Sequence, residues 1–210
     1  MKMLVTAGPT QEPIDPVRYI GNRSSGKMGY AVAEAARRQG HEVRLISGPS
    51  SLPSPAGVET FRVRTAAEML VAVRVNLGWC EALIMAAAVA DWRPVTVSDQ
   101  KLKKHTTRLV LELERTPDVL VEVLPLKGSR VYVGFAAETE DLEVSAEKKL
   151  RAKGLDLIVA NDVTKPGSGF GTDTNEVMFI ARGEPRLALP LMAKTAVAER
   201  IVDWVVRHRS

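Results

Sequence analysis

The apolar run Met3-Leu-Val-Thr-Ala7 stops at Gly8-Pro9, a pattern typical of a buried strand and its end. A loop rich in Pro and Gly follows. From residue 25 to a glycine at 40, apolar residues recur at the spacing of a helix, and a second apolar run lies at 43–46. Strand, helix and strand in this order are the start of an α/β fold with parallel strands.

The alternation continues along the rest of the chain. We expect further strands at 61–63, 83–88, 131–136 and 157–160, and a closing hairpin at 177–180 and 187–189. We expect helices at 65–77, 140–153 and 192–207. Another helix should begin at Pro117, with Thr116 as its N-cap. Such repetition predicts one three-layer, Rossmann-like α/β domain over 1–210, with a mainly parallel sheet and helices on both faces.

Two segments interrupt the alternation. Residues 93–114 predict a flap-like excursion, partly β, and the glycines of 165–175 predict a mobile surface loop.

The amino-acid composition limits the classes of protein to which this chain can belong. Of 210 residues, 45% are hydrophobic and 26% charged, which excludes disorder. The longest apolar run, 82–90, is too short for a membrane span, and we expect no signal peptide. The chain has a single cysteine, Cys80, which cannot form an intrachain disulfide and fits a reducing cytoplasm. We expect Cys80 to be a buried small hydrophobic side chain. Net charge +4 with 5% aromatic residues favours an anionic small substrate over nucleic acid.

The loop Gly21-Asn-Arg-Ser-Ser-Gly26-Lys27 has the spacing of a phosphate-binding P-loop. Met28 stands where such a loop needs Ser or Thr for magnesium, and the loop begins well after the first strand, so the P-loop interpretation fails. Ser24, Ser25 and Gly26 still precede a helix, whose N–H groups attract anions together with Lys27. The alternative is a plain capped helix whose glycines allow tight packing.

A second candidate site follows the expected strand 83–88. Its stretch Ala86-Ala-Ala-Val-Ala-Asp91 lies where open α/β sheets bind ligands, and small side chains let a flat base approach the backbone. Asp91 could accept a hydrogen bond from an exocyclic amine, or simply cap a helix. The stretch Ile46-Ser-Gly48 lacks the acidic residue of a dinucleotide site, and no G-x-G-x-x-G is present.

Lysines form two groups. Lys101, Lys103 and Lys104 could close over a triphosphate or form a solvated edge. Lys149 and Lys153 share one helix face, as phosphate ligands or as part of a solvated stripe. The histidines are dispersed, without the spacing of zinc ligands, and the sequence leaves any metal ligands unknown.

In combination these motifs closely resemble one family, phosphopantothenoylcysteine synthetase. In many bacteria this enzyme is the C-terminal half of a bifunctional decarboxylase/synthetase flavoprotein. The resemblance is carried, in order and over nearly the whole chain, by Thr6-Ala-Gly-Pro-Thr-Gln-Glu-Pro-Ile-Asp-Pro-Val-Arg-Tyr19, Asn22-Arg-Ser-Ser-Gly-Lys-Met-Gly29, Ala86-Ala-Ala-Val-Ala-Asp-Trp92, Lys101-Leu-Lys-Lys104, Gly134-Phe-Ala-Ala-Glu-Thr139 and Leu155-Asp-Leu-Ile-Val-Ala-Asn-Asp162.

The resemblance implies a ligase that joins L-cysteine to 4′-phosphopantothenate through an acyl-cytidylate made from CTP. It also implies a magnesium requirement and a homodimer. Asn22 would hold the acyl-cytidylate, with Arg18 and Lys101 as further catalytic residues. Ser24, Ser25, Gly26 and Lys27 would bind substrate or phosphate. The nucleotide would be bound by Met85, Ala86, Ala87, Asp91, Lys101, Pro117, Asp118, Val119, Leu120, Phe135, Lys149 and Lys153.

Three questions stay open from the sequence. We expect no decarboxylase half before Met1, which leaves a stand-alone synthetase or one half of a longer protein. The bacterial-type strings Lys-x-Lys-Lys and Ala-Ala-Val-Ala-Asp favour CTP over the ATP used by the eukaryotic branch of the family. The rival hypotheses are a P-loop kinase or NTPase and a non-catalytic nucleotide-binding module.

Overall fold

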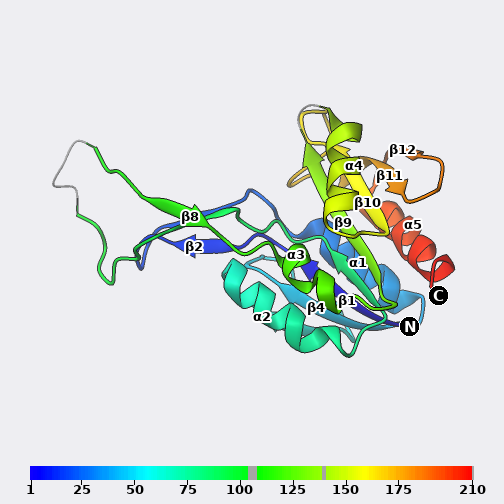
Figure 1. Ribbon diagram of the computed structural model, residues 1–210, viewed down its shortest axis with the longest axis horizontal. Coiled ribbons are helices and arrows are strands. Elements are labelled where there is room, and N and C mark those ends of the chain that lie inside the picture. The colour runs from blue at the N-terminus through cyan, green and yellow to red at the C-terminus, as the bar shows by residue number, and fades with distance from the viewer. Residues whose placement is uncertain (104–107, 139–140, 210) are drawn as a thin grey trace.

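A computed structural model describes residues 1–103, 108–138 and 141–209. Its centre is an eight-stranded sheet in the order β12-β11-β10-β9-β6-β1-β4-β5 (Figure 1). The strands are β1 (Lys2–Ala7), β4 (Glu42–Ser47), β5 (Glu59–Arg62), β6 (Ala82–Met85), β9 (Val131–Glu138), β10 (Leu157–Asp162), β11 (Thr174–Ala181) and β12 (Leu187–Ala193). All neighbours from β10 to β5 are parallel, and only β11 and β12 add antiparallel pairs, so the predicted mainly parallel sheet and closing hairpin are confirmed.

Helices cover both faces and make three layers. One face carries α1 (Lys27–Arg38) and α5 (Lys194–Arg207), and the other carries α2 (Ala66–Leu77), α3 (Val119–Val123) and α4 (Leu142–Ala152). Each face has its own apolar core, because side chains of the central strands point alternately to the two sides. A short 3₁₀ helix (Leu124–Leu126) follows α3. Among the described residues, no helix has the length and apolar character needed to span a membrane.

Several predicted helix boundaries are wrong for local reasons. α1 begins at Lys27 and not at 25, because Gly26 adopts a left-handed backbone with φ 84°. The N-cap of α3 is Asp118, whose side chain accepts from the Val121 N–H, whereas Thr116 donates its hydroxyl to the Ala90 carbonyl. α5 begins at Lys194 and not at 192, because the two preceding residues still pair in β12.

The strand expected at 83–88 is also shorter than predicted. β6 ends at Met85, and the chain then leaves the sheet, with only a single bridge between Ala88 and Pro9. The strand expected at 61–63 is displaced to Glu59–Arg62, and Asn175, expected in the Gly-rich loop, belongs to β11.

An arm (residues 10–21, 91–103 and 108–116) projects from the sheet (Figure 1). It contains two hairpins, β2 (Gln11–Pro13) with β3 (Tyr19–Gly21), and β7 (Trp92–Pro94) with β8 (Leu113–Arg115). The pairing of β7 with β8 confirms the prediction that the excursion expected at 93–114 is partly β. The first hairpin was expected to be loop, since three-residue strands carry too few positions for a sequence pattern. Lys104 lies outside the described residues.

Candidate active site

A cavity of about 660 Å³ lies beside the start of α1, at the carboxyl ends of β6, β9 and β10. β1 and β6 are neighbours, but the chain first runs outward to β4 and β5 and returns later to β6. Ligands bind at such switch points in open α/β sheets. Sixteen of the residues predicted for the site line this cavity: Asn22, Ser24, Ser25, Gly26, Lys27, Met85, Ala86, Ala87, Asp91, Pro117, Asp118, Val119, Leu120, Phe135, Lys149 and Lys153.

The floor of the cavity is the segment 86–91, fixed by hydrogen bonds from the β1 end of the chain. The Thr6 hydroxyl accepts from the Ala87 N–H at 3.1 Å, and the Thr10 hydroxyl accepts from the Ala90 N–H at 2.9 Å. Both threonines are fully buried. The floor is therefore held in place before any ligand arrives, and its small side chains leave room above it.

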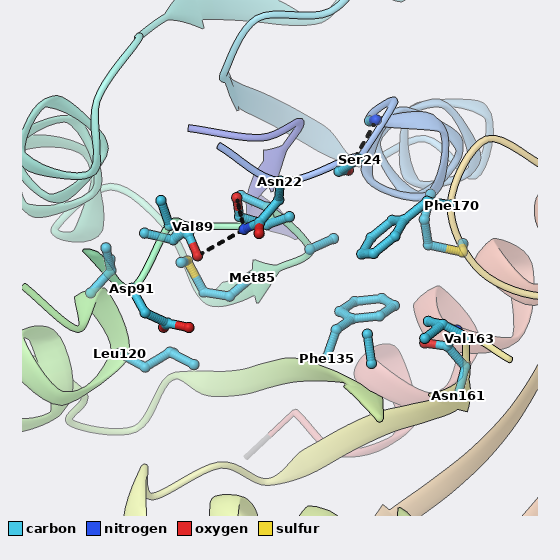
Figure 2. A pocket seen from close by; sticks show the side chains of 18 of the residues that line it. Asn22, Ser24, Met85, Val89, Asp91, Leu120, Phe135, Asn161, Val163 and Phe170 are labelled. Atoms are coloured by element: carbon cyan, nitrogen blue, oxygen red, sulfur yellow. Dashed lines mark hydrogen bonds between the residues drawn. The ribbon is translucent and has the colours of Figure 1, made fainter. Parts of the chain in front are cut away.

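Asn22 crosses from β3 to this floor. Its side-chain nitrogen donates to the carbonyl oxygens of Ala88 at 3.0 Å and Val89 at 3.1 Å (Figure 2). Both amide hydrogens are thus engaged with the backbone. Asn22 therefore ties the loop that precedes α1 to the floor of the cavity.

The start of α1 forms the next wall. A Cβ on Gly29 would lie 2.5 Å from the Cβ of Ala7, so only glycine lets α1 pack this closely on β1. The Ser24 hydroxyl accepts from the Gly26 N–H at 3.3 Å. The first N–H groups of any helix lack acceptors within it, and they carry the positive end of the helix dipole. An anion in the cavity would meet this helix start.

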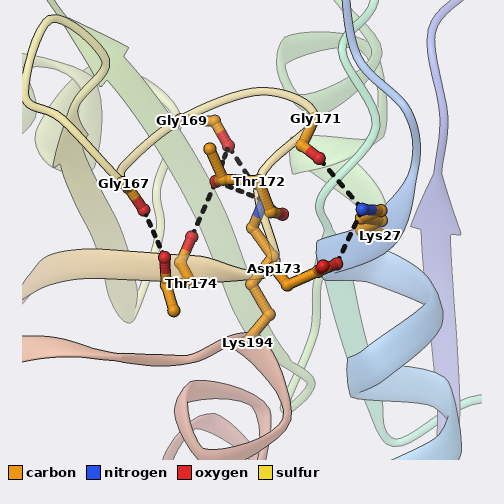
Figure 3. Close-up of polar contacts among 8 residues, drawn as sticks. All are labelled: Lys27, Gly167, Gly169, Gly171, Thr172, Asp173, Thr174 and Lys194. Atoms are coloured by element: carbon orange, nitrogen blue, oxygen red, sulfur yellow. Dashed lines mark hydrogen bonds and ion pairs between the residues drawn. The ribbon is translucent and has the colours of Figure 1, made fainter.

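Lys27 lines the same wall, but its ammonium is engaged. It donates to Asp173 Oδ1 at 2.6 Å and to the Gly171 carbonyl at 2.9 Å, both in the Gly-rich loop (Figure 3). The side-chain hydrogen bond and charge of Lys27 hold the pKa of Asp173 below its usual value.

The opposite wall comes from α3 and α4. Lys149 and Lys153 both line the cavity, as their helical spacing predicts. Lys153 pairs with Asp118 at 2.9 Å, across the entrance to α3. Figure 2 shows Asp91 and Leu120 near each other at the edge of the cavity. This wall therefore carries two cationic side chains, of which Lys153 is paired with a carboxylate.

Arg18 and Lys101 do not line the cavity. Both belong to the arm, where Arg18 donates to the Leu102 carbonyl at 3.0 Å and Asp15 accepts from the Leu102 N–H at 3.1 Å. Burial raises the pKa of Asp15, but hydrogen bonds from the Val17, Leu102 and Arg18 N–H groups outweigh it and leave the pKa lowered. The pair Asp15–Arg18 thus fixes the backbone next to Lys101, which is exposed.

The sequence did not single out several cavity residues. Asn161 is the last residue but one of β10, and it lines the cavity together with Phe170, Asn175 and Lys194. Asn161 could have been found by the rule that pointed to Asp91, since polar residues at carboxyl ends of parallel strands face ligands. Lys194 gives no such signal, because it is a single lysine at the start of a helix.

Cys80 is buried, with 4% of its surface exposed, as predicted. Burial raises the pKa of its thiol to about 11. Neither cysteine nor histidine occurs among the residues that line the cavity, and the described parts of the chain contain no group of three metal-ligating side chains. The site offers cationic groups, amides and helix N–H groups, which suit the binding of anions more than attack by a side-chain nucleophile.

Comparison with known proteins agrees with this geometry. Residues 1–208 match the family described as "DNA/pantothenate metabolism flavoprotein C-terminal domain". The coenzyme A biosynthesis bifunctional protein CoaBC of Bacillus subtilis (strain 168) is 50% identical over 97% of this chain and 50% of its own length, and that of Escherichia coli (strain K12) is 46% identical over 98% of this chain and 52% of its own. The chain thus spans about half the length of these relatives.

Solved structures show the same fold. The crystal structure of the C-terminal domain of a CoaBC protein superposes with a TM-score of 0.83 at 42% identity, covering 97% of this chain and 93% of that one. The DNA/pantothenate metabolism flavoprotein of Streptococcus pneumoniae gives 0.85 at 26% identity, covering 99% of both chains. The family resemblance inferred from the motifs is confirmed: this chain belongs to the DNA/pantothenate metabolism flavoprotein C-terminal domain family, and it corresponds to the C-terminal half of CoaBC proteins.

Proposed function

We propose that this chain joins L-cysteine to 4′-phosphopantothenate at the cavity, in two steps. The substrate carboxylate attacks the α-phosphate of CTP, so that an acyl-cytidylate forms and pyrophosphate leaves. The cysteine amine then attacks the acyl carbon, an amide bond forms and CMP leaves. The relatives' role in coenzyme A biosynthesis supports this assignment.

One observation carries the proposal. A floor of small residues ending in Asp91, the Asn22 amide, a helix start and the pair Lys149 and Lys153 converge on one cavity. A carboxylate reacts with an amine only after its oxygen becomes part of a leaving group. The work of such an enzyme is to hold two anionic substrates together and to stabilise charge on phosphate, and these groups are suited to it.

In this proposal the cytosine base of CTP is contacted by Met85, Ala86, Ala87 and Asp91. The phosphates of CTP are contacted by Lys149 and Lys153. Asn22 lies between the nucleotide and the acyl group. Magnesium would arrive with the triphosphate, because it is usually bound by one or two carboxylates together with substrate phosphates. Asp91 and Asp118 are the carboxylates that line the cavity in the described part of the chain.

We also propose that the protein works as a homodimer in the cytoplasm. Of the seventeen large hydrophobic residues that the described structure exposes, eight lie on the arm: Val17, Tyr19, Trp92, Val95, Val97, Leu109, Val110 and Leu113. Apolar surface concentrated on one projection is typical of a protein–protein interface. A symmetric dimer through the arms would cover it, and cyclic dimers are the commonest assemblies.

A pyrophosphate-release assay tests the function. CTP with phosphopantothenate should give a burst of pyrophosphate, and cysteine should turn the burst into steady turnover with phosphopantothenoylcysteine as product. Hydrolysis of nucleotide without phosphopantothenate would support the NTPase hypothesis. Binding of CTP without any pyrophosphate would support a non-catalytic module.

A further inference from the structure

Thr116 does not have the role that its place before a helix suggests. Asp118 caps α3, so the Thr116 side chain is available for another contact. The Thr116 hydroxyl donates to the Ala90 carbonyl oxygen, and the Thr116 N–H donates to the Asp91 carbonyl oxygen at 3.0 Å. Thr116 also lines the cavity. It therefore holds the two residues with which the floor of the cavity ends.

Thr10 holds the same end of the floor from a second direction. Its hydroxyl accepts from the Ala90 N–H at 2.9 Å, and its N–H donates to the Ala88 carbonyl oxygen at 3.1 Å. β6 has already ended at Met85, so two hydroxyls take the place of a strand partner for the backbone of Ala90. Ala90 is buried, and it is clamped between the first and the last residue of the arm, Thr10 and Thr116.

The Asp91 side chain has no such support of its own. It is exposed and lines the cavity. Its carboxylate accepts no hydrogen bond and forms no ion pair within the described residues. A side chain without a partner lies where its backbone places it. The position of the carboxylate therefore depends on the bonds from Thr116 to Ala90 and Asp91.

Thr116 also joins the floor to the wall beside it. Pro117, Asp118 and the first turn of α3 follow Thr116 in the chain, and they line the cavity. Figure 2 shows Leu120 of α3 near Asp91. A displacement at Thr116 would therefore change the spacing between the carboxylate and this wall.

We infer that Thr116 is a positioning residue that fixes the place of the Asp91 carboxylate and thereby contributes to the choice of nucleotide. The role in selectivity rests on the proposed function, in which Asp91 contacts the cytosine base. The hold of Thr116 on the floor does not rest on it.

The test removes the Thr116 hydroxyl alone. Thr116→Val keeps the branched shape and the backbone N–H, but it leaves the buried Ala90 carbonyl without its donor. We expect the ratio of kcat/KM for CTP to that for ATP to fall about fivefold, mainly through a higher KM for CTP, because no group that takes part in the chemistry changes. Thr116→Ser keeps the hydroxyl and should restore the ratio to within about twofold of the wild type.

A double-mutant cycle identifies the group through which Thr116 acts. In the Asp91→Asn background, Thr116→Val should lower the ratio by less than about twofold, because the charge that Thr116 positions is already absent. Fully additive effects of the two substitutions would overturn the inference.

Thr65→Val is the matched control. The Thr65 hydroxyl also bonds to the backbone, since it accepts from the Glu68 N–H at 3.2 Å as the N-cap of α2, but Thr65 does not line the cavity. Thr65→Val should lower the melting temperature and leave the nucleotide ratio unchanged. If Thr116→Val does not fold, Thr116→Ala takes its place in the cycle.

Amide hydrogen exchange separates the inference from the proposed function. The Ala90 N–H should exchange about threefold or more faster in Thr116→Val than in the wild type, and at the wild-type rate in Thr65→Val, whatever reaction the protein catalyses. Inactive wild type together with this faster exchange would refute the ligase and keep the hold of Thr116 on the floor. Unchanged exchange at Ala90, or an unchanged nucleotide ratio in active Thr116→Val, would overturn the inference.

Discussion

Asn22 donates a 3.0 Å hydrogen bond to the carbonyl oxygen of Ala88, and thereby ties the loop before α1 to the floor of the cavity. The second amide hydrogen goes to Val89 at 3.1 Å. An aspartate in this place would have the same shape but no donor, and it would face two carbonyl oxygens.

Asn22→Asp should slow amide formation by roughly 10- to 100-fold. Unsatisfied polar groups cost about 1–3 kcal/mol, and 1.4 kcal/mol corresponds to about a factor of ten in rate. We expect the acyl-cytidylate to accumulate after CTP and phosphopantothenate are mixed, as mass spectrometry would show. Arg23→Ala, a change of the exposed neighbour that does not line the cavity, serves as control. A normal rate of amide formation would reduce Asn22 to a turn residue.

Lys101 lies on the arm and outside the cavity, and we expect it to reach the phosphates when CTP is bound. Lys101→Gln should then slow formation of the acyl-cytidylate by roughly 10- to 1000-fold, because charge-assisted hydrogen bonds to phosphate are worth about 1.5–3 kcal/mol and their loss leaves oxygens unpaired. The melting temperature should not change, since Lys101 is exposed on the arm. The measurement is pyrophosphate release in a single turnover. Lys148→Gln, on the exposed side of α4, is the control. Wild-type rates would show that the arm lysines are a solvated edge.

Asp15→Ala should make the arm easier to cleave with trypsin after Lys101 and Lys103. Asp15 accepts from the Leu102 N–H, and without this bond the Arg18 bond to the Leu102 carbonyl is the one that remains at Leu102 among the described residues. Peptide masses after brief digestion report the cleavage sites. Cleavage at the wild-type rate would mean that Arg18 alone fixes the segment.

The same carboxylate predicts a pH dependence. Its pKa is lower in the folded chain than the ordinary value of 3.8, so Asp15 stabilises the fold above that pH, and this stability is lost as pH falls towards the folded pKa. Urea titrations at pH 6 and pH 3 should show a larger loss for wild type than for Asp15→Asn. Equal losses would exclude Asp15 as a source of acid sensitivity.

Asp91→Asn should weaken the selectivity for CTP over ATP by about tenfold, the size expected when a charged acceptor becomes neutral. The asparagine oxygen can still accept a hydrogen bond from the base amine, so turnover should persist. The ratio of kcat/KM for the two nucleotides is the measurement. Equal values for CTP and ATP in the wild type would refute the assignment of the floor to cytosine.

Cys80 should react with iodoacetamide far more slowly in the native protein than in urea at pH 8. The thiolate is the reactive form, and burial raises the pKa of the thiol from 9.0 to about 11. Because the folded pKa is the higher one, stability should fall as pH rises from about 9 towards 11. Equal labelling rates in both states would contradict the burial of this residue.

The main sheet and its helices could be predicted from the sequence, because the spacing of apolar residues in strands and helices is a local signal. The backbone could not be predicted where tertiary contacts determine its conformation. The hairpin Gln11–Pro13 with Tyr19–Gly21 is held by contacts such as the 2.8 Å bond from the Gln11 N–H to the Arg64 carbonyl, which no local pattern reveals.

Part of the candidate site could likewise be predicted from local patterns, and part of it depends on tertiary contacts. Motifs at a helix start and a strand end pointed to Asn22 and Asp91, and helical spacing pointed to Lys153; the fold gathers all three at the cavity. Arg18 was predicted from the family resemblance and Lys101 from a lysine cluster, and both lie on the arm, away from the cavity. Phe170 and Lys194 needed the structure, since their meaning depends on a contact between a loop and the start of a distant helix.

The arm also affects how the particle moves through solution. A compact body with a long projection diffuses more slowly than a sphere of equal mass, so its Stokes radius overstates its molecular weight. Elution volume from a sizing column would assign too many copies to the assembly, and a monomer could pass for a dimer. Sedimentation velocity combined with light scattering separates shape from mass, and the frictional ratio would then report the arm itself.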